Sequence, residues 1–437
     1  MLKKSLFLLL SMLCPLAFAQ SFGGPGVLSG NNGSIGQRSG QDVDLKFFVN
    51  ANSIYDTGLT PYAVTQQGTL VRPGALKGIE AGLGAYGKHT FRRSSFGLDY
   101  SGNFRHYPSA SRYDGSNQQL RLAYIYQKSR KLLLDFSASA GTQSFGTAFG
   151  SVPGQTDAIV SGSSLIFDNR TSYLQTSVNA RYALSGRTTM VVGGDYYTIH
   201  RQSSGLVGVN GYSLNGAINH RLSRNTIVGV SYQHSHYDFP RAFGEADINT
   251  YSGDWSTTLG RSLVLAVSGG VFLSDVQGVQ STALDPSIAA LLGIGSVQTI
   301  FYQKNVMPVG RASITKLFRH SSLSGQVSRS VMNGNGIYLT SRQEQISVGY
   351  SYTGFRKWSL SVGGTTVKLD SLGQNLLPYR QYSASSNLGY NIRGGFQVVA
   401  TYNRRYQDVL ANSFLRDSAR VSFGIYWSPG SIPISFH

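Results

Sequence analysis

Two histidines have the spacing of possible metal ligands. His234 and His236 are two residues apart in a segment that alternates apolar and polar side chains, so they share one face of a strand, with Asp238 next on that side. Neutral imidazoles at this spacing can hold zinc or copper. The same face also carries Val230 and Tyr232. The pattern therefore favours a position above an apolar belt, in contact with lipid head groups, over a metal site.

Catalytic signatures are missing from the sequence. Ser, His and Asp are scattered without a Gly-x-Ser-x-Gly elbow, a His-Glu-x-x-His pair or a phosphate-binding loop, which leaves only a triad assembled from distant strands open. The only cysteine, Cys14, falls in the segment that we expect to be removed, so the mature chain forms no disulfide and no thiolate metal site. We predict that the protein is not an enzyme and needs no cofactor or metal.

The N-terminus has the pattern of a signal peptide over residues 1–19. Lys3 and Lys4 precede an apolar run that ends in Ala17-Phe18-Ala19. Residues 20–42 are rich in Gly, Ser and Asn, which predicts a flexible arm.

The mature chain keeps a large positive charge. Removal of Lys3 and Lys4 with the signal peptide lowers the formal net charge from +18 to +16. Export disfavours a nucleic-acid partner, which leaves anionic lipid head groups or a pore that favours anions. The short basic turns also account for part of the excess without any ligand.

From residue 43 onward one unit repeats, in which 10 to 14 residues alternate apolar and polar side chains before a break. This period of two predicts strands, and no later segment has the roughly 18 to 20 apolar residues of a membrane-spanning helix. We predict an all-β fold, a single transmembrane antiparallel up-and-down β-barrel of about eighteen strands (16–18) over residues 43–427, followed by a tail at 428–437. The expected strands cover 43–53, 74–88, 94–106, 117–128, 131–144, 170–184, 187–200, 211–222, 225–238, 247–260, 262–275, 304–318, 321–332, 341–354, 356–368, 379–392, 395–406 and 416–427.

Short and long breaks alternate along this series. The short ones, such as Ser129-Arg130 and Arg393-Gly394, carry Arg or Lys and are expected to be periplasmic turns, whereas the long ones are expected to be extracellular loops. The third loop, 145–169, and the sixth, 276–303, contain apolar residues that a solvated loop does not need. In the sixth, Asp285-Pro286 can begin a short helix that runs to Leu292.

Alternation assigns the two faces of each strand. In 131–144, Leu134 and Phe136 would face lipid, which turns Asp135 and Ser137 inward and predicts a polar, wet interior. The inward charges are either wall residues that pair with one another or a ladder that guides anions. The candidate pore-lining charges are Lys46, Glu80, Asp99, Arg105, Arg121, Asp135, Arg181, Asp195, Arg221, Asp254, Arg311, Arg405 and Arg420.

Aromatic residues near the strand ends fall on the same face of their strands as the apolar residues, which indicates aromatic girdles at the two membrane interfaces.

One strand departs from the alternating pattern, because Arg329 shares a face with Leu323 and Val327. Arg329 must then lie near the interface, or a bulge must shift the register. A homo-oligomer would need such polar interruptions of the outer face, and Arg329 is the one that the sequence offers.

The unit from Ser213 to Tyr232, two alternating strands joined at Ser223-Arg224, resembles the hairpins of porin-like Gram-negative outer-membrane β-barrel proteins. The resemblance covers about 43–427. It implies a channel in the cell outer membrane for passive diffusion of small hydrophilic solutes, narrowed by the third loop at 145–169. The inward charges add anions as one option for these solutes. Some proteins of this kind take part in exopolysaccharide export or envelope assembly, which is the alternative function. The implied partners are outer-membrane lipid, small hydrophilic solutes or polysaccharide, and the outer-membrane assembly machinery.

The C-terminus departs from that class, in which an aromatic residue usually closes the last strand. Here Trp427 is followed by Ser428-Pro429 and a further apolar stretch that ends in Phe436-His437. Either the strand stops at Trp427, or a kinked extension makes Phe436 the assembly signal. Prolines 429 and 433 favour the first option.

Overall fold

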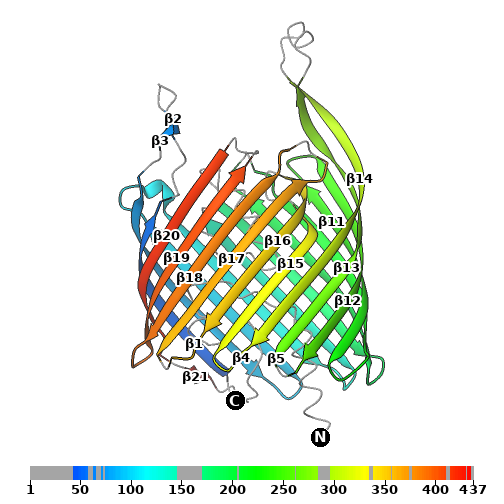
Figure 1. The fold of residues 1–437 in the computed structure, drawn as a ribbon, viewed down its shortest axis with the longest axis horizontal. Coiled ribbons are helices and arrows are strands. Elements are labelled where there is room, and N and C mark those ends of the chain that lie inside the picture. The colour runs from blue at the N-terminus through cyan, green and yellow to red at the C-terminus, as the bar shows by residue number, and fades with distance from the viewer. Residues whose placement is uncertain are drawn as a thin grey trace.

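In the computed structural model, long tilted strands form a closed barrel wall with short turns at one end and longer connections at the other (Figure 1). The structure describes residues 43–57, 63–64, 70–71, 74–144, 170–203, 206–260, 262–283, 296–333, 338–355, 357–373, 376–409, 414–429 and 431–434. The elements are β1 (Val43–Asp56), β2 (Ala63–Val64), β3 (Leu70–Val71), β4 (Leu76–Thr90), β5 (Ser94–His106), the 3₁₀ turn η1 (Ser111–Tyr113), β6 (Gly115–Gln127), β7 (Leu132–Ser144), β8 (Arg170–Ala183), β9 (Thr188–Arg201), β10 (Val209–Arg221), β11 (Thr226–Phe239), β12 (Gly244–Leu259), β13 (Leu263–Ala283), β14 (Ser296–Leu317), β15 (Ser321–Asn333), β16 (Thr340–Tyr352), β17 (Trp358–Ser371), β18 (Tyr379–Asn391), β19 (Phe396–Val409), β20 (Phe414–Trp427) and β21 (Ser431–Ile434).

The first strand closes the barrel. β1 pairs with β4 on one side and with β20 and β21 on the other, and each strand from β4 to β20 pairs antiparallel with its neighbours in the chain. Within the described residues the wall therefore has eighteen strands, because β2 and β3 form a separate hairpin and β21 continues the edge of β20. Closure removes the unpaired backbone groups that an open sheet would expose to lipid. The predicted all-β barrel of about eighteen strands is confirmed.

The outer face of the wall is apolar. In β16, Ile346, Val348 and Tyr350 are exposed at 48%, 54% and 38%, and they alternate with Ser347 and Gly349 on the opposite face. The other strands repeat this pattern, as alternation along a strand requires. An apolar belt on a closed barrel is the surface that a bilayer covers, so the protein is an outer-membrane barrel. No helix within the described residues is long and apolar enough to cross a membrane.

The sixth connection differs from the expected loop. β13 continues to Ala283 and β14 begins at Ser296, so most of 276–303 is a β-ribbon that projects from the end opposite the short turns (Figure 1). Outside the bilayer a ribbon needs no continuous apolar face, so the regular alternation that predicts the wall strands stops there. The helix expected from Asp285 to Leu292 lies outside the described residues.

The C-terminus also differs from the favoured prediction. β20 ends at Trp427, but Ser431–Ile434 pairs with Val43–Lys46 of β1, so part of the region expected to be a tail extends the wall. Pro433 is tolerated because it lies in a short edge segment. The signal peptide, the arm at 20–42 and the third loop at 145–169 lie outside the described residues and stay predictions.

We predict that the two faces differ sharply in tolerance to charge. Val348→Arg places a cation on the lipid-facing side in the middle of β16, whereas Ser347→Arg places it on the inner face. The first should lower the free energy of unfolding by about 2–4 kcal/mol, and the second by much less. Urea unfolding of the folded barrel in phosphatidylcholine vesicles measures both. Equal losses of unfolding free energy in the two variants would contradict the assignment of Val348 to the outer face and Ser347 to the inner face.

Candidate functional site

The thirteen charges predicted to line the lumen all lie on the inner face of the wall. Each is out of phase with the exposed apolar residues in the middle of its strand. For example, Arg181 of β8 alternates with the exposed Val178 and Tyr182, and Asp195 of β9 lies next to the exposed Tyr196. The inner face is therefore the candidate functional surface.

A charged cluster lies toward the extracellular ends of β20, β1, β4 and β5. Arg420 donates from Nη2 to Oε2 of Glu80 at 2.5 Å, and both side chains are largely buried. Arg105 interacts electrostatically with Asp56, Glu80 and Arg420, and its Nη2 lies 3.4 Å from the carbonyl oxygen of Ser144. Two cations and two carboxylates thus share one low-dielectric part of the interior, where their interactions are stronger than in water.

Strand register brings these residues together from distant parts of the chain. Asp56 is opposite Arg420 in the β1–β20 pair, and Glu80 is opposite Arg105 in the β4–β5 pair. Asn52 of β1 is opposite Glu80 and links the two pairs. A shift of one residue in any of these pairs would turn a charge toward lipid.

The connection after β5 covers this cluster. Tyr107 is fully buried against Ile54 and Tyr113, and the Arg105 guanidinium carbon lies 5.7 Å from the centre of its ring. Asp114 accepts a hydrogen bond from the Tyr107 backbone N–H at 2.7 Å and pairs with His106 at 2.6 Å. Burial acts to raise the pKa of Asp114, but these two hydrogen bonds and the nearby charges of His106 and Arg105 together outweigh it and leave that pKa below its usual value.

A second row of inward charges lies nearer the periplasmic end, on β5 to β8. Asp99 is opposite Arg121 in the β5–β6 pair. Asp135 interacts electrostatically with Arg181 and Arg121. These side chains are half-buried, in contrast to the cluster around Arg420. Charges of alternating sign thus follow the wall from the periplasmic half toward the extracellular cluster.

The remaining predicted charges have separate partners or positions. Lys46 and Arg221 lie near the periplasmic ends of β1 and β10, and Arg405 is buried in β19. Three others make polar contacts: Ser213 Oγ donates to Asp195 at 3.0 Å, Ser231 Oγ to Asp254 at 3.0 Å, and Arg311 Nη2 to Gln326 Oε1 at 3.2 Å. Asp195, Asp254 and Arg311 lie on β9, β12 and β14, away from the strands that form the cluster around Arg420.

Sequence reasoning missed three inward charges. Asp56 lies beyond the expected end of the first strand, although the alternation that places Lys46 inward also places Asp56 inward. Lys88 of β4 has the same phase as Glu80. Arg201, at the end of β9, is 1% exposed and donates from Nε to the carbonyl oxygen of Val207 at 3.2 Å. Extending the alternation to the strand ends would have found all three.

The interior is not polar throughout, in contrast to the prediction from strand alternation. Toward the extracellular ends of β8 to β13, ten buried side chains form an apolar cluster: Tyr173, Ile199, Val209, Phe239, Ala246, Ile248, Phe272, Val276, Leu339 and Leu372. Leu339 and Leu372 come from connections beside β16 and β17, so the cluster joins wall and loop residues. Such packing depends on how loops fold over the wall, which strand alternation does not encode. The polar rows and the apolar cluster occupy different arcs of the barrel.

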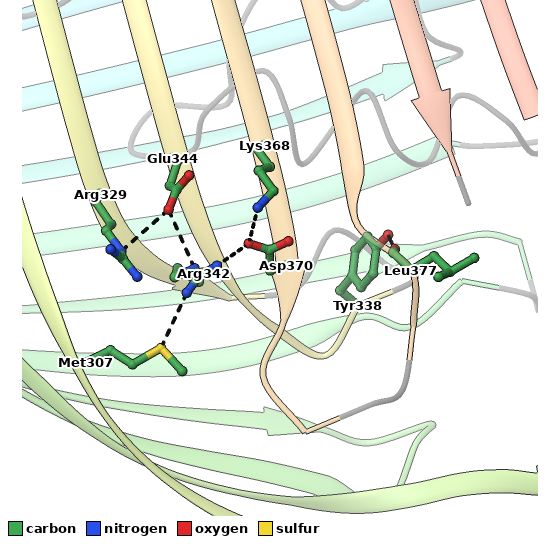
Figure 2. A network of polar contacts seen from close by, with 8 residues as sticks. All are labelled: Met307, Arg329, Tyr338, Arg342, Glu344, Lys368, Asp370 and Leu377. Atoms are coloured by element: carbon green, nitrogen blue, oxygen red, sulfur yellow. Dashed lines mark hydrogen bonds and ion pairs between the residues drawn. The ribbon is translucent and has the colours of Figure 1, made fainter. Parts of the chain in front are cut away.

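On the opposite face of the wall, an ionic network explains the position of Arg329. Glu344 lies 3.6 Å from Arg329 and 3.8 Å from Arg342, and Asp370 lies 2.5 Å from Arg342 and 3.0 Å from Lys368 (Figure 2). The network lies toward the extracellular ends of β15, β16 and β17, beyond their exposed apolar residues. Of the two explanations for Arg329, the interfacial one fits, because its ladder with β16 continues without a bulge.

The two histidines also lie on the outer face of the wall. His236 Nδ1 is 2.9 Å from Asp247 Oδ1, and His234 Nδ1 is 3.1 Å from Asn249 Oδ1. Asp238 is opposite Glu245 in the next strand. Among the described residues, no group of three or more His, Cys, Asp and Glu side chains is placed to hold a metal ion. The pair lies on the face of the strand that alternation predicts, beyond the exposed Val230 and Tyr232, and its contact with lipid head groups stays a prediction.

Comparison with solved structures returns outer-membrane barrels. OccAB3 of Acinetobacter baumannii is 12% identical over 88% of this chain and 99% of its own, with a TM-score of 0.39. A BenF-like porin of Pseudomonas fluorescens Pf-5 is 9% identical over 90% and 99%, with a TM-score of 0.43. The ferric-catecholate import receptor Fiu of E. coli K12 is 8% identical over 90% and 82%, with a TM-score of 0.46. These values are too low to assign a solute to this chain. No protein-family profile and no curated protein matches the sequence.

We predict that Glu80 stabilises the barrel through Arg420. Glu80→Gln leaves Arg420 and Arg105 close together with less compensating charge, so the free energy of unfolding should fall by about 3 kcal/mol. The control is Asp99→Asn, a half-buried inward carboxylate on the neighbouring strand, for which about 1 kcal/mol or less is expected. Urea unfolding in lipid vesicles provides the comparison, and equal losses would show that the cluster is not a stabilising unit.

Proposed function

We propose that the protein is a porin-like channel through which small hydrophilic solutes diffuse passively. The observation that carries this proposal is the continuity of inward charges along one arc of the wall. They run from Asp135 and Arg181, through Asp99 and Arg121, to the cluster around Arg420. A water-filled path needs such a polar lining, whereas an interior that only fills space does not.

Cations outnumber carboxylates on this inner face, which supports a preference for anions. Among the strand side chains whose burial the structure describes, the inward set contains ten Lys and Arg residues and six Asp and Glu residues, counting Asp56, Lys88 and Arg201 with the predicted thirteen. Fixed positive charge in a low-dielectric channel concentrates anions. The preference should strengthen at low salt, where screening is weaker and the field of the fixed charges reaches farther.

Passage is expected to be most restricted toward the extracellular end. There the inward Arg105, Arg405 and Arg420 are each less than a tenth exposed, and the apolar cluster occupies the opposite arc. Narrowing by the third loop, 145–169, remains part of the proposal.

Recordings in planar bilayers test the channel and its selectivity together. We expect the purified protein to conduct, with a reversal potential under a salt gradient that indicates anion preference. Arg121→Gln with Arg181→Gln should move the anion-to-cation permeability ratio toward one, because both side chains lie on the inner face. Arg112→Gln, which changes an exposed extracellular residue, is the control. Absence of conductance at every voltage would overturn the proposal, and an unchanged ratio in the double variant would overturn the role of these charges.

A further inference from the structure

The short turns hold a concentrated positive charge that the channel does not use. Eight connections of three to five residues join strands at the periplasmic rim, and together they contain twelve Lys and Arg residues and no Asp or Glu. The nine extracellular connections contain three Lys and Arg residues and four Asp residues. The basic residues are therefore gathered at one rim, which we call the basic rim.

The basic side chains that the structure describes in this rim are exposed on the surface of the protein. Every one that the structure describes is exposed, namely Arg92, Arg93, Lys128, Arg130, Lys131, Arg187, Arg224, Arg319, Lys357 and Arg393. Arg261 and Arg356 complete the series in the sequence and lie outside the described residues. Since no turn contains a carboxylate, the rim as a whole carries a net charge available to an anion.

Three of the turns share a serine-anchored conformation. The Oγ atoms of Ser129, Ser185 and Ser223 each accept hydrogen bonds from the backbone N–H groups two and three residues later, at 3.0 to 3.2 Å. In the β18–β19 turn, Gly394 and Gly395 adopt φ angles of +77° and +81°, which suit glycine. These turns hold the backbone of their basic residues in one conformation, which lowers the entropy lost when a ligand binds.

An exposed apolar residue accompanies the charge in seven of the eight turns. These residues lie within the turn or at its edge and are 48% to 63% exposed: Phe91, Leu184, Leu222, Leu259, Phe318, Phe355 and Ile392. An apolar side chain beside a long cationic one matches the interfacial zone of a bilayer, where the first reaches acyl chains and the second reaches phosphates. A surface meant only for solvent would not repeat this pair.

We propose that the basic rim binds the anionic phospholipid head groups of the periplasmic leaflet. The turns follow one whole end of the barrel (Figure 1), so their ligand must surround the protein, as a lipid leaflet does. A soluble acidic partner would contact one arc and would have no use for apolar residues all round. The shell of anionic lipid holds the barrel at a fixed depth, and this role does not depend on whether the lumen conducts.

The three tryptophans provide a built-in probe of this leaflet. Trp255, Trp358 and Trp427 lie on the outer face near the periplasmic ends of their strands, and each is about two-fifths exposed. Lipids with brominated acyl chains quench tryptophan on contact, so quenching reports which lipid occupies the shell beside the rim. We expect brominated phosphatidylglycerol to associate about fivefold more strongly than brominated phosphatidylcholine in mixed bilayers of low salt.

Variants of the serine-anchored turns provide the decisive comparison. The triple variant Arg130→Gln, Arg187→Gln and Arg224→Gln should lose at least half of that preference. The matched control Lys77→Gln, Arg112→Gln and Arg380→Gln, which removes three exposed charges at the extracellular end, should retain it. Equal quenching by the two lipids in the unmodified protein, or equal losses in both variants, would overturn the proposal. Binding of soluble polyglutamate without any lipid preference would assign the rim to a soluble acidic partner instead.

Discussion

The rest of the structure depends on pairing backbone N–H and C=O groups where no water can reach them. A strand edge left open in lipid would expose a row of such groups at a cost of several kcal/mol each. The chain meets this constraint by returning β20 to β1, so that the first and last wall strands are neighbours. Once the sheet is closed, every side chain points either to lipid or to the interior.

Closure also determines which charges can interact. The pairing of β1 with both β4 and β20 places Asp56 and Glu80 beside arginines that are distant in the sequence. These pairs compensate one another in the interior, whereas the ionic network around Arg342 compensates charge at the outer surface. Charge is tolerated on each face of the wall where partners from adjacent strands are in register.

Local patterns made most of the fold predictable. Strand alternation and basic, serine- or glycine-containing turns placed the wall strands to within a few residues, except at the β13–β14 ribbon, where no bilayer imposes an apolar face. The inner face followed from the same alternation, and Asp56 was missed only because its strand was ended early. The apolar cluster of Leu339 with Phe272 was not predictable, because it depends on loop residues folding across several strands. The ionic partners of Arg329 were not predictable either, because they come from neighbouring strands.

The most direct test of the account is the closing pair. Ala51 of β1 is opposite Ile425 of β20. In a chain in which Ser replaces Cys14, Ala51→Cys with Ile425→Cys should form a disulfide within one folded barrel under mild oxidation. Ala51→Cys with Val421→Cys, displaced by four positions, should not. Failure of the first pair to cross-link, or cross-linking only between chains, would contradict a wall closed by β1 and β20.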